Sequence, residues 1–148
     1  MKILVCTDGS KQSRKAVDEA VRIATGCTVS QVTIITILGI RSIWTDTSPY
    51  SVASTDSDQL KRIEEQEVAK REGFLSEAKE AFARHNIEAT TLLKRGNPAH
   101  TIAKIANEEG YDMIVIGRRG LGGLERPYPG SVSIAVLFEA KTNVLVVQ

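Results

Sequence analysis

Cysteine, aromatic side chains and net charge are all scarce in this sequence of 148 residues. Its two cysteines, Cys6 and Cys27, form neither a C-x-x-C pair nor a zinc-ligand spacing, so we expect two reduced thiols and no cysteine metal site. Cys6 lies inside an apolar segment, where burial would leave its thiol unreactive. The formal net charge of +1 gives no general attraction to nucleic acid or to a membrane surface, so any anion site must be built locally.

Long hydrophobic runs are also missing. No apolar segment approaches the roughly 20 residues that are needed to cross a bilayer. The apolar start of the chain, residues 1–5, is too short for a signal peptide and reads as a strand. We therefore expect a cytoplasmic protein with no membrane partner. A chain of 148 residues fits one domain, residues 1–148, which can bury a core without disulfides or metals.

What the sequence does contain is a regular alternation of strand and helix patterns. Short apolar and β-branched runs predict buried strands over residues 2–7, 32–37, 87–93, 112–116 and 143–147. Helical spacing and helix-start signals predict helices over residues 10–25, 58–84, from 97 onward, and over 131–139. Buried strands that alternate with helices predict an α/β fold: a single open, five-stranded parallel sheet with helices on both faces, which is Rossmann-like.

Two stretches depart from this alternation. Residues 39–57 have no hydrophobic periodicity and are long for a loop in a compact domain, so we interpret them as a mobile segment or a lid. The first half of the long predicted helix, residues 61–67, is almost wholly charged. We interpret it as a solvated face, with contact to a partner subunit as the alternative.

The most informative motif consists of two short runs separated by nine residues, Gly117-Arg118-Arg119-Gly120 and Gly130-Ser131-Val132-Ser133. The motif leaves the end of a predicted strand and closes onto the start of a predicted helix. Glycines let backbone N–H groups approach an anion closely, and a helix N-terminus adds N–H donors and partial positive charge. The hydroxyls of Ser131 and Ser133 stand where an N-cap is expected. This pattern predicts a site for a polyphosphate.

A second polar group, Asp8, follows the first predicted strand. In doubly wound sheets, ligands bind outside the carboxyl ends of the strands, where the connections change direction. If the first and fourth strands are neighbours, Asp8 and the glycine motif lie together, and Asp8 can accept a hydrogen bond from an exocyclic amine or a ribose hydroxyl. The alternative is that Asp8 caps the next helix. For Arg118 and Arg119 the alternatives are bidentate pairing with phosphate and a plain surface position.

These motifs resemble the nucleotide-binding signature of the universal stress protein family. The resemblance runs in order over essentially the whole chain and rests on the G-x2-G-x9-G-S spacing, Val5-x-x-Asp8-Gly9-Ser10, Gly96-Asn97-Pro98 and a terminal Val-Leu-Val-Val strand. It implies a five-stranded, adenine nucleotide alpha hydrolase-like fold. It also implies ATP, with Mg²⁺, as the bound nucleotide, and a homodimer through the last strand, Asn143–Val147. An apolar strand at a sheet edge favours the same pairing.

The resemblance also implies which residues contact the nucleotide. The adenine contacts fall on Cys6, Thr7, Asp8 and Ile37. The ribose and phosphate contacts fall on Gly117, Arg118, Arg119, Gly120, Gly130, Ser131, Val132 and Ser133. One departure from the family pattern is the run Glu-Arg-Pro-Tyr-Pro at residues 125–129, where an apolar, helix-compatible run is usual. Its prolines remove two N–H donors and stiffen the backbone, so phosphate contacts are not carried over to residues 121–129.

No catalytic residue or metal ligand set stands out. His85 and His100 are far apart in sequence, and there is no Ser-His-Asp constellation, nucleophile elbow or Walker loop. We therefore favour an ATP-binding regulatory protein of the stress response, which acts by nucleotide occupancy and by binding an unidentified protein partner. Two alternatives stay open: a slow ATPase or phosphotransferase, and an ATP-independent interaction protein whose prolines have spoiled the site.

Overall fold

The computed structural model describes residues 1–39, 57–119 and 130–148. The segment that we interpreted as a mobile loop or lid therefore lies almost wholly outside the described residues. In chain order the elements are β1 (Lys2–Cys6), α1 (Lys11–Gly26), β2 (Gln31–Leu38), α2 (Ser57–Ala83), β3 (Ala89–Arg95), α3 (Pro98–Glu108), β4 (Met113–Gly117), α4 (Ser131–Glu139) and β5 (Asn143–Val147).

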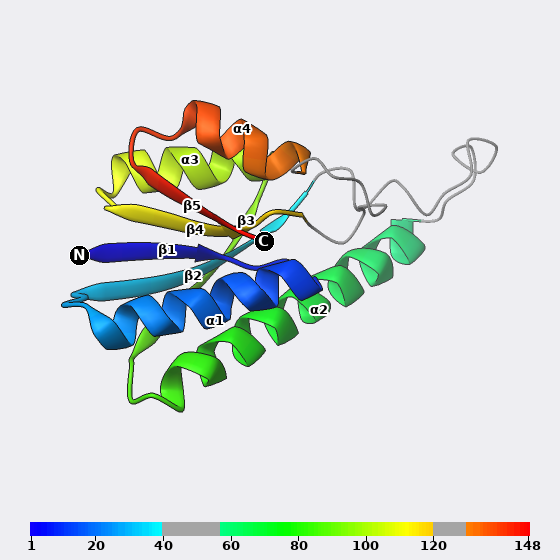
Figure 1. Ribbon diagram of the computed structural model, residues 1–148. Coiled ribbons are helices and arrows are strands. Elements are labelled where there is room, and N and C mark those ends of the chain that lie inside the picture. The colour runs from blue at the N-terminus through cyan, green and yellow to red at the C-terminus, as the bar shows by residue number, and fades with distance from the viewer. Residues whose placement is uncertain (40–56, 120–129) are drawn as a thin grey trace.

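The strands form one parallel sheet in the order β3-β2-β1-β4-β5. Helices α1 and α2 cover one face, and α3 and α4 cover the other (Figure 1). This arrangement confirms the predicted open, Rossmann-like sheet. The chain moves outward from β1 to β3 and then returns to β4 on the other side of β1, so the connections change direction between β1 and β4. These two strands pair directly, with Val5 opposite Val115.

Two hydrophobic layers form the core, one on each face of the sheet. Successive residues of β1 alternate between them: Ile3 and Val5 pack in the layer under α1 and α2, whereas Leu4 and Cys6 pack in the layer under α3 and α4. Phe82 of α2 is fully buried in the first layer. Because the central strands are buried on both faces, their sequences read as continuous apolar runs rather than as alternating ones.

The third strand lies two residues later than the sequence predicts, from Ala89 to Arg95 instead of 87–93. Asn86 has a positive φ of 57°, and the N–H of Ile87 donates to the carbonyl oxygen of Phe82 at 3.2 Å, so this part of the chain still belongs to the exit from α2. At the other end, Arg95 stays in the ladder opposite Leu38. Since β3 is an edge strand with exposed polar residues, its apolar pattern is too weak to fix these limits.

The N-terminal half of α2 runs past the carboxyl edge of the sheet (Figure 1). Lys61, Arg62 and Glu65 are exposed there, as expected for a solvated face, whereas Glu64 forms an ion pair with Arg95 of β3. The buried residues of α2 lie in its second half. Within the part of the chain that the structure describes, neither α2 nor any other helix has the length and hydrophobicity that a membrane span requires.

Candidate functional site

Two loops meet at the carboxyl edge of the sheet. One leads from β1 through Asp8 to α1, and the other leaves β4 through Arg118 and Arg119. Their strands are neighbours, and the loops are joined directly, because the hydroxyl of Ser10 donates a hydrogen bond to the carbonyl oxygen of Arg119 at 3.3 Å. The structure therefore brings the Asp8 loop and the start of the glycine motif together, as the sequence predicts.

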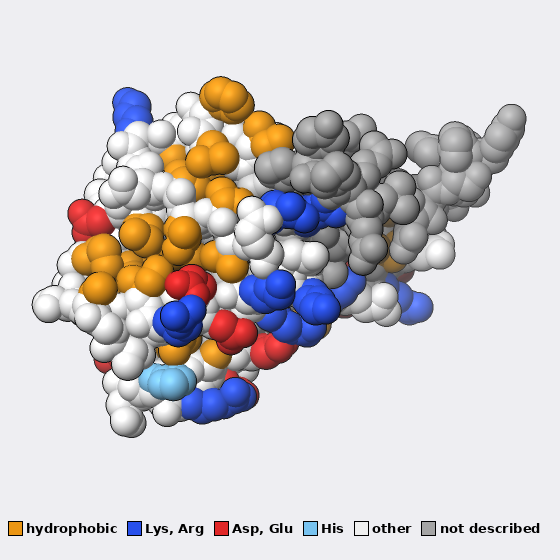
Figure 2. Space-filling view, in the orientation of Figure 1, with side chains coloured by type: hydrophobic (Ala, Val, Ile, Leu, Met, Phe, Trp, Pro, Cys, Tyr) orange, Lys and Arg blue, Asp and Glu red, His pale blue; other side chains and the backbone are white. Residues whose placement is uncertain are grey.

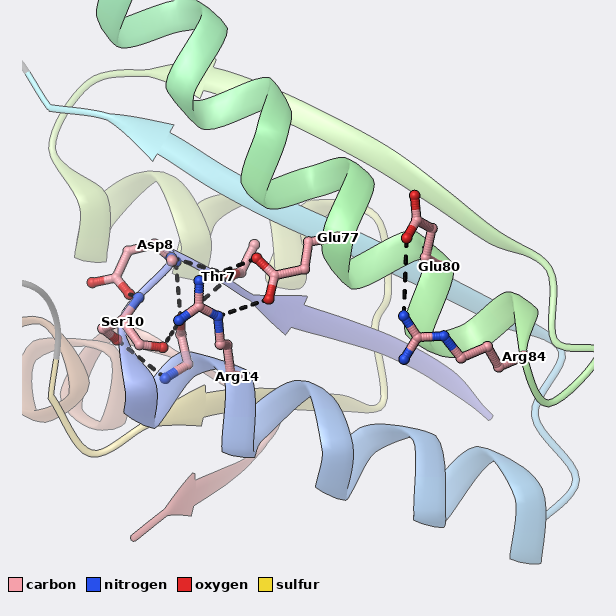
Figure 3. A network of polar contacts seen from close by, with 9 residues as sticks. Thr7, Asp8, Ser10, Arg14, Glu77, Glu80 and Arg84 are labelled. Atoms are coloured by element: carbon pink, nitrogen blue, oxygen red, sulfur yellow. Dashed lines mark hydrogen bonds and ion pairs between the residues drawn. The ribbon is translucent and has the colours of Figure 1, made fainter.

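The loop after β1 is ordered by Ser10 and Asp8. Ser10 is the N-cap of α1, where its Oγ accepts a hydrogen bond from the N–H of Ser13 at 3.1 Å. Asp8 does not cap the helix. Its Oδ1 instead accepts the N–H of Ser10 at 3.0 Å, which fixes the turn before the helix (Figure 3). The half-buried carboxylate of Asp8 thus stands at the sheet edge, and each of its oxygens can accept more than one hydrogen bond.

Glycine is favoured in this turn by its backbone conformation. Gly9 has a φ of +78°, which disfavours other residues, and a Cβ placed on it would lie 2.3 Å from the ring of Phe74. Each residue of the Asp-Gly-Ser sequence thus has a structural role. Asp8 accepts the hydrogen bond of the turn, Gly9 adopts the positive φ next to α2, and Ser10 caps α1.

Gly117, the first glycine of the motif, lies where β4 approaches the start of α1. A Cβ on Gly117 would lie 2.7 Å from both the carbonyl carbon and the carbonyl oxygen of Gln12, and 2.9 Å from the backbone nitrogen of Ser13. These are backbone atoms that cannot move aside as a side chain can. Gly117 therefore allows α1 to pack on β4, and it has this role whether or not an anion binds.

The residues on either side of the segment 120–129 are tied together, and we call Arg118, Arg119 and Gly130 the loop base. The N–H of Arg118 donates to Val147 of β5, and the N–H of Gly130 donates to the carbonyl oxygen of Arg118, each at 2.7 Å. The hydroxyl of Ser133 lies 3.0 Å from the same oxygen of Arg118 and 2.9 Å from that of Gly130. The ends of the loop are thus fixed against β5 and α4.

Parts of the predicted phosphate loop cannot be compared with the structure. Gly120, Pro127 and Pro129 lie outside the described residues. The effect of the two prolines on the path of the loop therefore stays a prediction. The predicted residues that are described stand at the two ends of that segment. Ser131 is exposed in the first turn of α4, whereas Ser133 is buried, with its hydroxyl on the loop base.

The start of α4 differs from those of α1 and α3. Its N-cap is Gly130, which supplies no side-chain hydrogen bond, whereas Ser10 caps α1 and Asn97 caps α3. The first N–H groups of a helix have no partner within the helix. At α4 the N-cap residue Gly130 supplies no side-chain acceptor to them, and the helix dipole favours an anion at that position.

The predicted adenine contacts lie around the end of β1. Cys6, Thr7 and Ile37 are all buried, and Cys6 and Ile37 share the layer under α3 and α4. Burial, together with the nearby charge of Asp8, raises the pKa of the Cys6 thiol far above its usual range. The burial of Cys6 that the sequence predicts is thus confirmed, and the raised pKa disfavours the reactive thiolate.

Positive charge gathers beside the two loops. Lys11, Arg14 and Lys15 are exposed on the first turns of α1, and Figure 2 shows Lys and Arg side chains collected in that region. Arg14 is held by Glu77 of α2, with hydrogen bonds of 2.7 and 3.2 Å to the two carboxylate oxygens (Figure 3). The guanidinium of Arg14 is thereby directed toward α2.

Other polar groups of the described residues do not form a second site. No group of three His, Cys, Asp or Glu side chains within residues 1–39, 57–119 and 130–148 is placed to hold a metal ion. A shallow polar depression of about 560 Å³ lies at the opposite edge of the sheet. Its amide side chains brace the chain: Asn107 bonds to the backbone of Glu139 and Lys141, and Asn143 bonds to that of Asp112.

Sequence reasoning named Ser10 only as part of the Asp-Gly-Ser motif and did not identify its contacts, and it did not identify Ser13 at all. Their spacing, Ser-x-x-Ser before an apolar helical pattern, is a possible N-cap signal. The bond from Ser10 to Arg119 has no sequence signal, because it joins residues 109 positions apart.

Comparisons with known proteins agree with this fold. The model of the universal stress protein family matches residues 1–148. Universal stress protein YxiE of Bacillus subtilis is 35% identical over 151 residues, covering 99% of this chain and 98% of the relative. The structure of universal stress protein UspA from Lactobacillus plantarum superposes with a TM-score of 0.82 at 25% identity, covering 100% and 97% of the two chains.

Similar structures include one that was solved with a nucleotide. A universal stress protein solved in complex with cAMP superposes with a TM-score of 0.71 at 28% identity, covering 100% of this chain and 97% of that one. The family match over the whole chain, together with the relative from Bacillus subtilis, shows that this chain belongs to the universal stress protein family.

Proposed function

We propose that this universal stress protein binds ATP, with Mg²⁺, where the loops after β1 and β4 meet, and that nucleotide occupancy regulates its contact with a protein partner. The observation that carries the proposal is the start of α4, a helix N-terminus without a side-chain cap, held in place by the loop base. An anionic group suits it, because backbone N–H groups and the helix dipole act together there.

The phosphate end of the nucleotide would lie on Gly130, Ser131 and Val132, next to Arg118 and Arg119. Gly130 has no side chain of its own that could cover the first N–H groups of α4. Both arginines are half-buried, and one terminal guanidinium nitrogen of Arg119 is itself buried. Gly117 and Ser133 would contribute by holding the surrounding backbone, since one clears α1 and the other bonds to the loop base.

The nucleoside end would lie against the end of β1, where Cys6, Thr7, Asp8 and Ile37 stand. Asp8 offers a carboxylate that can accept a hydrogen bond from the exocyclic amine of adenine. Guanine has a carbonyl oxygen at the corresponding position, which the carboxylate would repel. The similar structure with cAMP supports an adenine ligand for this chain. The two cysteines of this chain are free thiols, which suits a reducing compartment, and we propose that the protein is cytoplasmic.

Calorimetric titration of the wild-type protein with Mg-ATP and Mg-GTP tests the proposal. We expect one ATP per chain and at least fivefold weaker binding of GTP. Phosphate release from bound ATP should stay well below one per second, because Asp8 is assigned to the nucleoside end and is not expected to orient a water at the γ-phosphate. Mass spectrometry of the native protein should detect a co-purified adenine nucleotide. Failure of ATP to bind would contradict the proposal, and rapid phosphate release would favour the enzyme alternative.

We also propose that a second copy of the chain pairs along β5. This strand is at the edge of the sheet, and its only ladder partner among the described residues is β4. Beside it, α4 exposes Ile134, Leu137 and Phe138 by 38%, 49% and 86%. Figure 2 shows hydrophobic side chains gathered over β5 and α4. An apolar surface next to an unpaired strand edge favours association with an identical edge.

Replacing Val146 with Pro should convert this dimer to a monomer. The carbonyl of Val147 faces β4, where it accepts from Arg118, so the N–H of Val146 points to the open edge. Light scattering at micromolar concentration should give the wild type twice the 16.1 kDa chain mass and the variant the single mass. Phe138→Lys should weaken association without changing the strand. A wild-type protein of single mass would contradict the pairing.

A further inference from the structure

We infer that Ser10 is a positioning residue of the nucleotide site: its hydroxyl fixes the start of the phosphate loop against α1 and so sets the phosphate end relative to the nucleoside end. The inference rests on the proposed function, since it concerns the same site. Ser10 itself is not expected to touch the ligand, because it is only 5% exposed.

Ser10 lies at the junction of the two loops and uses all of its polar groups. Its N–H donates to Asp8 Oδ1 at 3.0 Å, its Oγ accepts from the N–H of Ser13 at 3.1 Å, and its hydroxyl proton goes to the carbonyl oxygen of Arg119 at 3.3 Å. A serine hydroxyl has one proton to donate and lone pairs to accept, so these roles are compatible. Ser10 therefore orders the turn that holds Asp8 through its backbone N–H, while its small side chain caps α1 and bonds to the loop base.

The bond from Ser10 to Arg119 ties the loop base to a different part of the fold from the bonds at Arg118. The N–H of Arg118 is bonded to β5, and its carbonyl oxygen is bonded to Gly130 and Ser133. Those bonds fix the loop base relative to β5 and α4. Ser10 fixes it relative to α1 and to the turn that carries Asp8. A ligand that spans both loops gains from this tie, because the two ends of its site are then held at one separation before binding.

The functional role of Ser10 can be separated from its role as a helix cap. Glycine is nearly as good an N-cap as serine but has no hydroxyl, so Ser10→Gly should keep most of the stability of α1 while it removes the bond to Arg119. Ser10→Ala removes the cap as well. Ser10→Thr keeps a hydroxyl with the same two roles. Ser13→Ala is the matched control: Ser13 is equally buried, at 4% exposure, and its hydroxyl bonds to the backbone of Ser10 in the same cluster.

The experiment compares ATP with adenosine, which has no phosphate, by competition against a fluorescent ATP analogue in the full chain. Ser10→Gly and Ser10→Ala should weaken ATP binding roughly fivefold, as expected for one lost hydrogen bond that positions the loop. Adenosine affinity should change less than twofold. Ser10→Thr should restore the ATP affinity, and Ser13→Ala should keep the wild-type ratio of ATP to adenosine affinity. A purely structural role would weaken both ligands equally.

The possible failures are distinguishable. If the wild type binds neither ATP nor adenosine, the proposed function is wrong, and the inference is wrong with it. If the wild type binds ATP but Ser10→Gly and Ser10→Ala keep the wild-type ratio of the two affinities, the proposed function stands and the positioning role of Ser10 is overturned. A change of that ratio by Ser13→Ala as large as that by Ser10→Ala would also overturn it, because the tie to Arg119 would not be the cause.

Discussion

Gly117→Ala should destabilise the folded protein by about 3 kcal/mol, near the upper end of the usual cost of overpacking. The added methyl carbon would lie 2.7 Å from backbone atoms of Gln12 and 2.9 Å from the backbone nitrogen of Ser13. The first turn of α1 must then move away from β4, and its buried residues move with it. Small domains are stable by about 5–15 kcal/mol, so a loss of this size is easily measured.

Urea denaturation followed by circular dichroism measures the change, with Gly73→Ala as the matched control. Gly73 lies inside α2, and a Cβ there would meet nothing within 4 Å. In a helix, alanine is favoured over glycine by up to about 1 kcal/mol, so the control should be more stable than the wild type. A free energy of unfolding for Gly117→Ala within 0.5 kcal/mol of the wild type, a margin of about the size of an ordinary surface effect, would contradict the packing role.

This packing role changes how the glycine motif is interpreted. The sequence predicts that Gly117 lets the backbone approach a phosphate, whereas the structure shows that Gly117 lets α1 approach the backbone of β4. A chain can therefore require the first glycine of the motif without binding a nucleotide. Gly130 is more informative about a ligand, since it leaves the start of α4 without a side-chain cap.

The sheet and most of its elements could be predicted from the sequence, because buried parallel strands and amphipathic helices have distinct hydrophobic periods. Helix α4 and strand β5 have the predicted limits, residues 131–139 and 143–147. The limits of β3 could not be predicted, since an edge strand has a weak apolar pattern and the left-handed conformation of Asn86 delays its start. The adjacency of β1 and β4 was a condition of the predicted site that the sequence did not settle, and the pairing of the two strands meets it.

The candidate site was predictable as a location but not as a set of contacts. Asp8 and Gly130 were identified because an acid after a strand and a glycine at a helix start have a recognisable chemistry. The bond between Ser10 and Arg119 depends on which strands become neighbours, and the position of the Ser133 hydroxyl depends on how α4 meets the loop base. Neither relation is local in the sequence, so no spacing rule can predict it. The predicted nucleotide contacts themselves stay predictions.

Gly130→Val should weaken ATP binding at least tenfold, which corresponds to about 1.4 kcal/mol or more. Gly130 has a φ of −71° and a ψ of 156°, so valine can adopt its backbone conformation without strain. A Cβ there would lie 3.2 Å from the carbonyl oxygen of Arg118 and 3.4 Å from the Cα of Arg119. The branched methyl groups would therefore press on the loop base and cover the first N–H groups of α4, where we propose that phosphate binds.

Calorimetry with Mg-ATP, together with a urea melt of the same sample, separates this effect from unfolding. The graded control is Gly130→Ala, which adds the Cβ alone and should cost less affinity than valine, because the loop base needs to shift by only a few tenths of an ångström. A series in which affinity falls from Gly to Ala to Val while the protein stays folded is the result expected of a ligand at the start of α4. A folded Gly130→Val variant that binds ATP as tightly as the wild type would exclude this position for the phosphates. Binding would then have to depend on another part of the carboxyl edge, with Asp8 and the exposed cations of α1 as the next residues to replace.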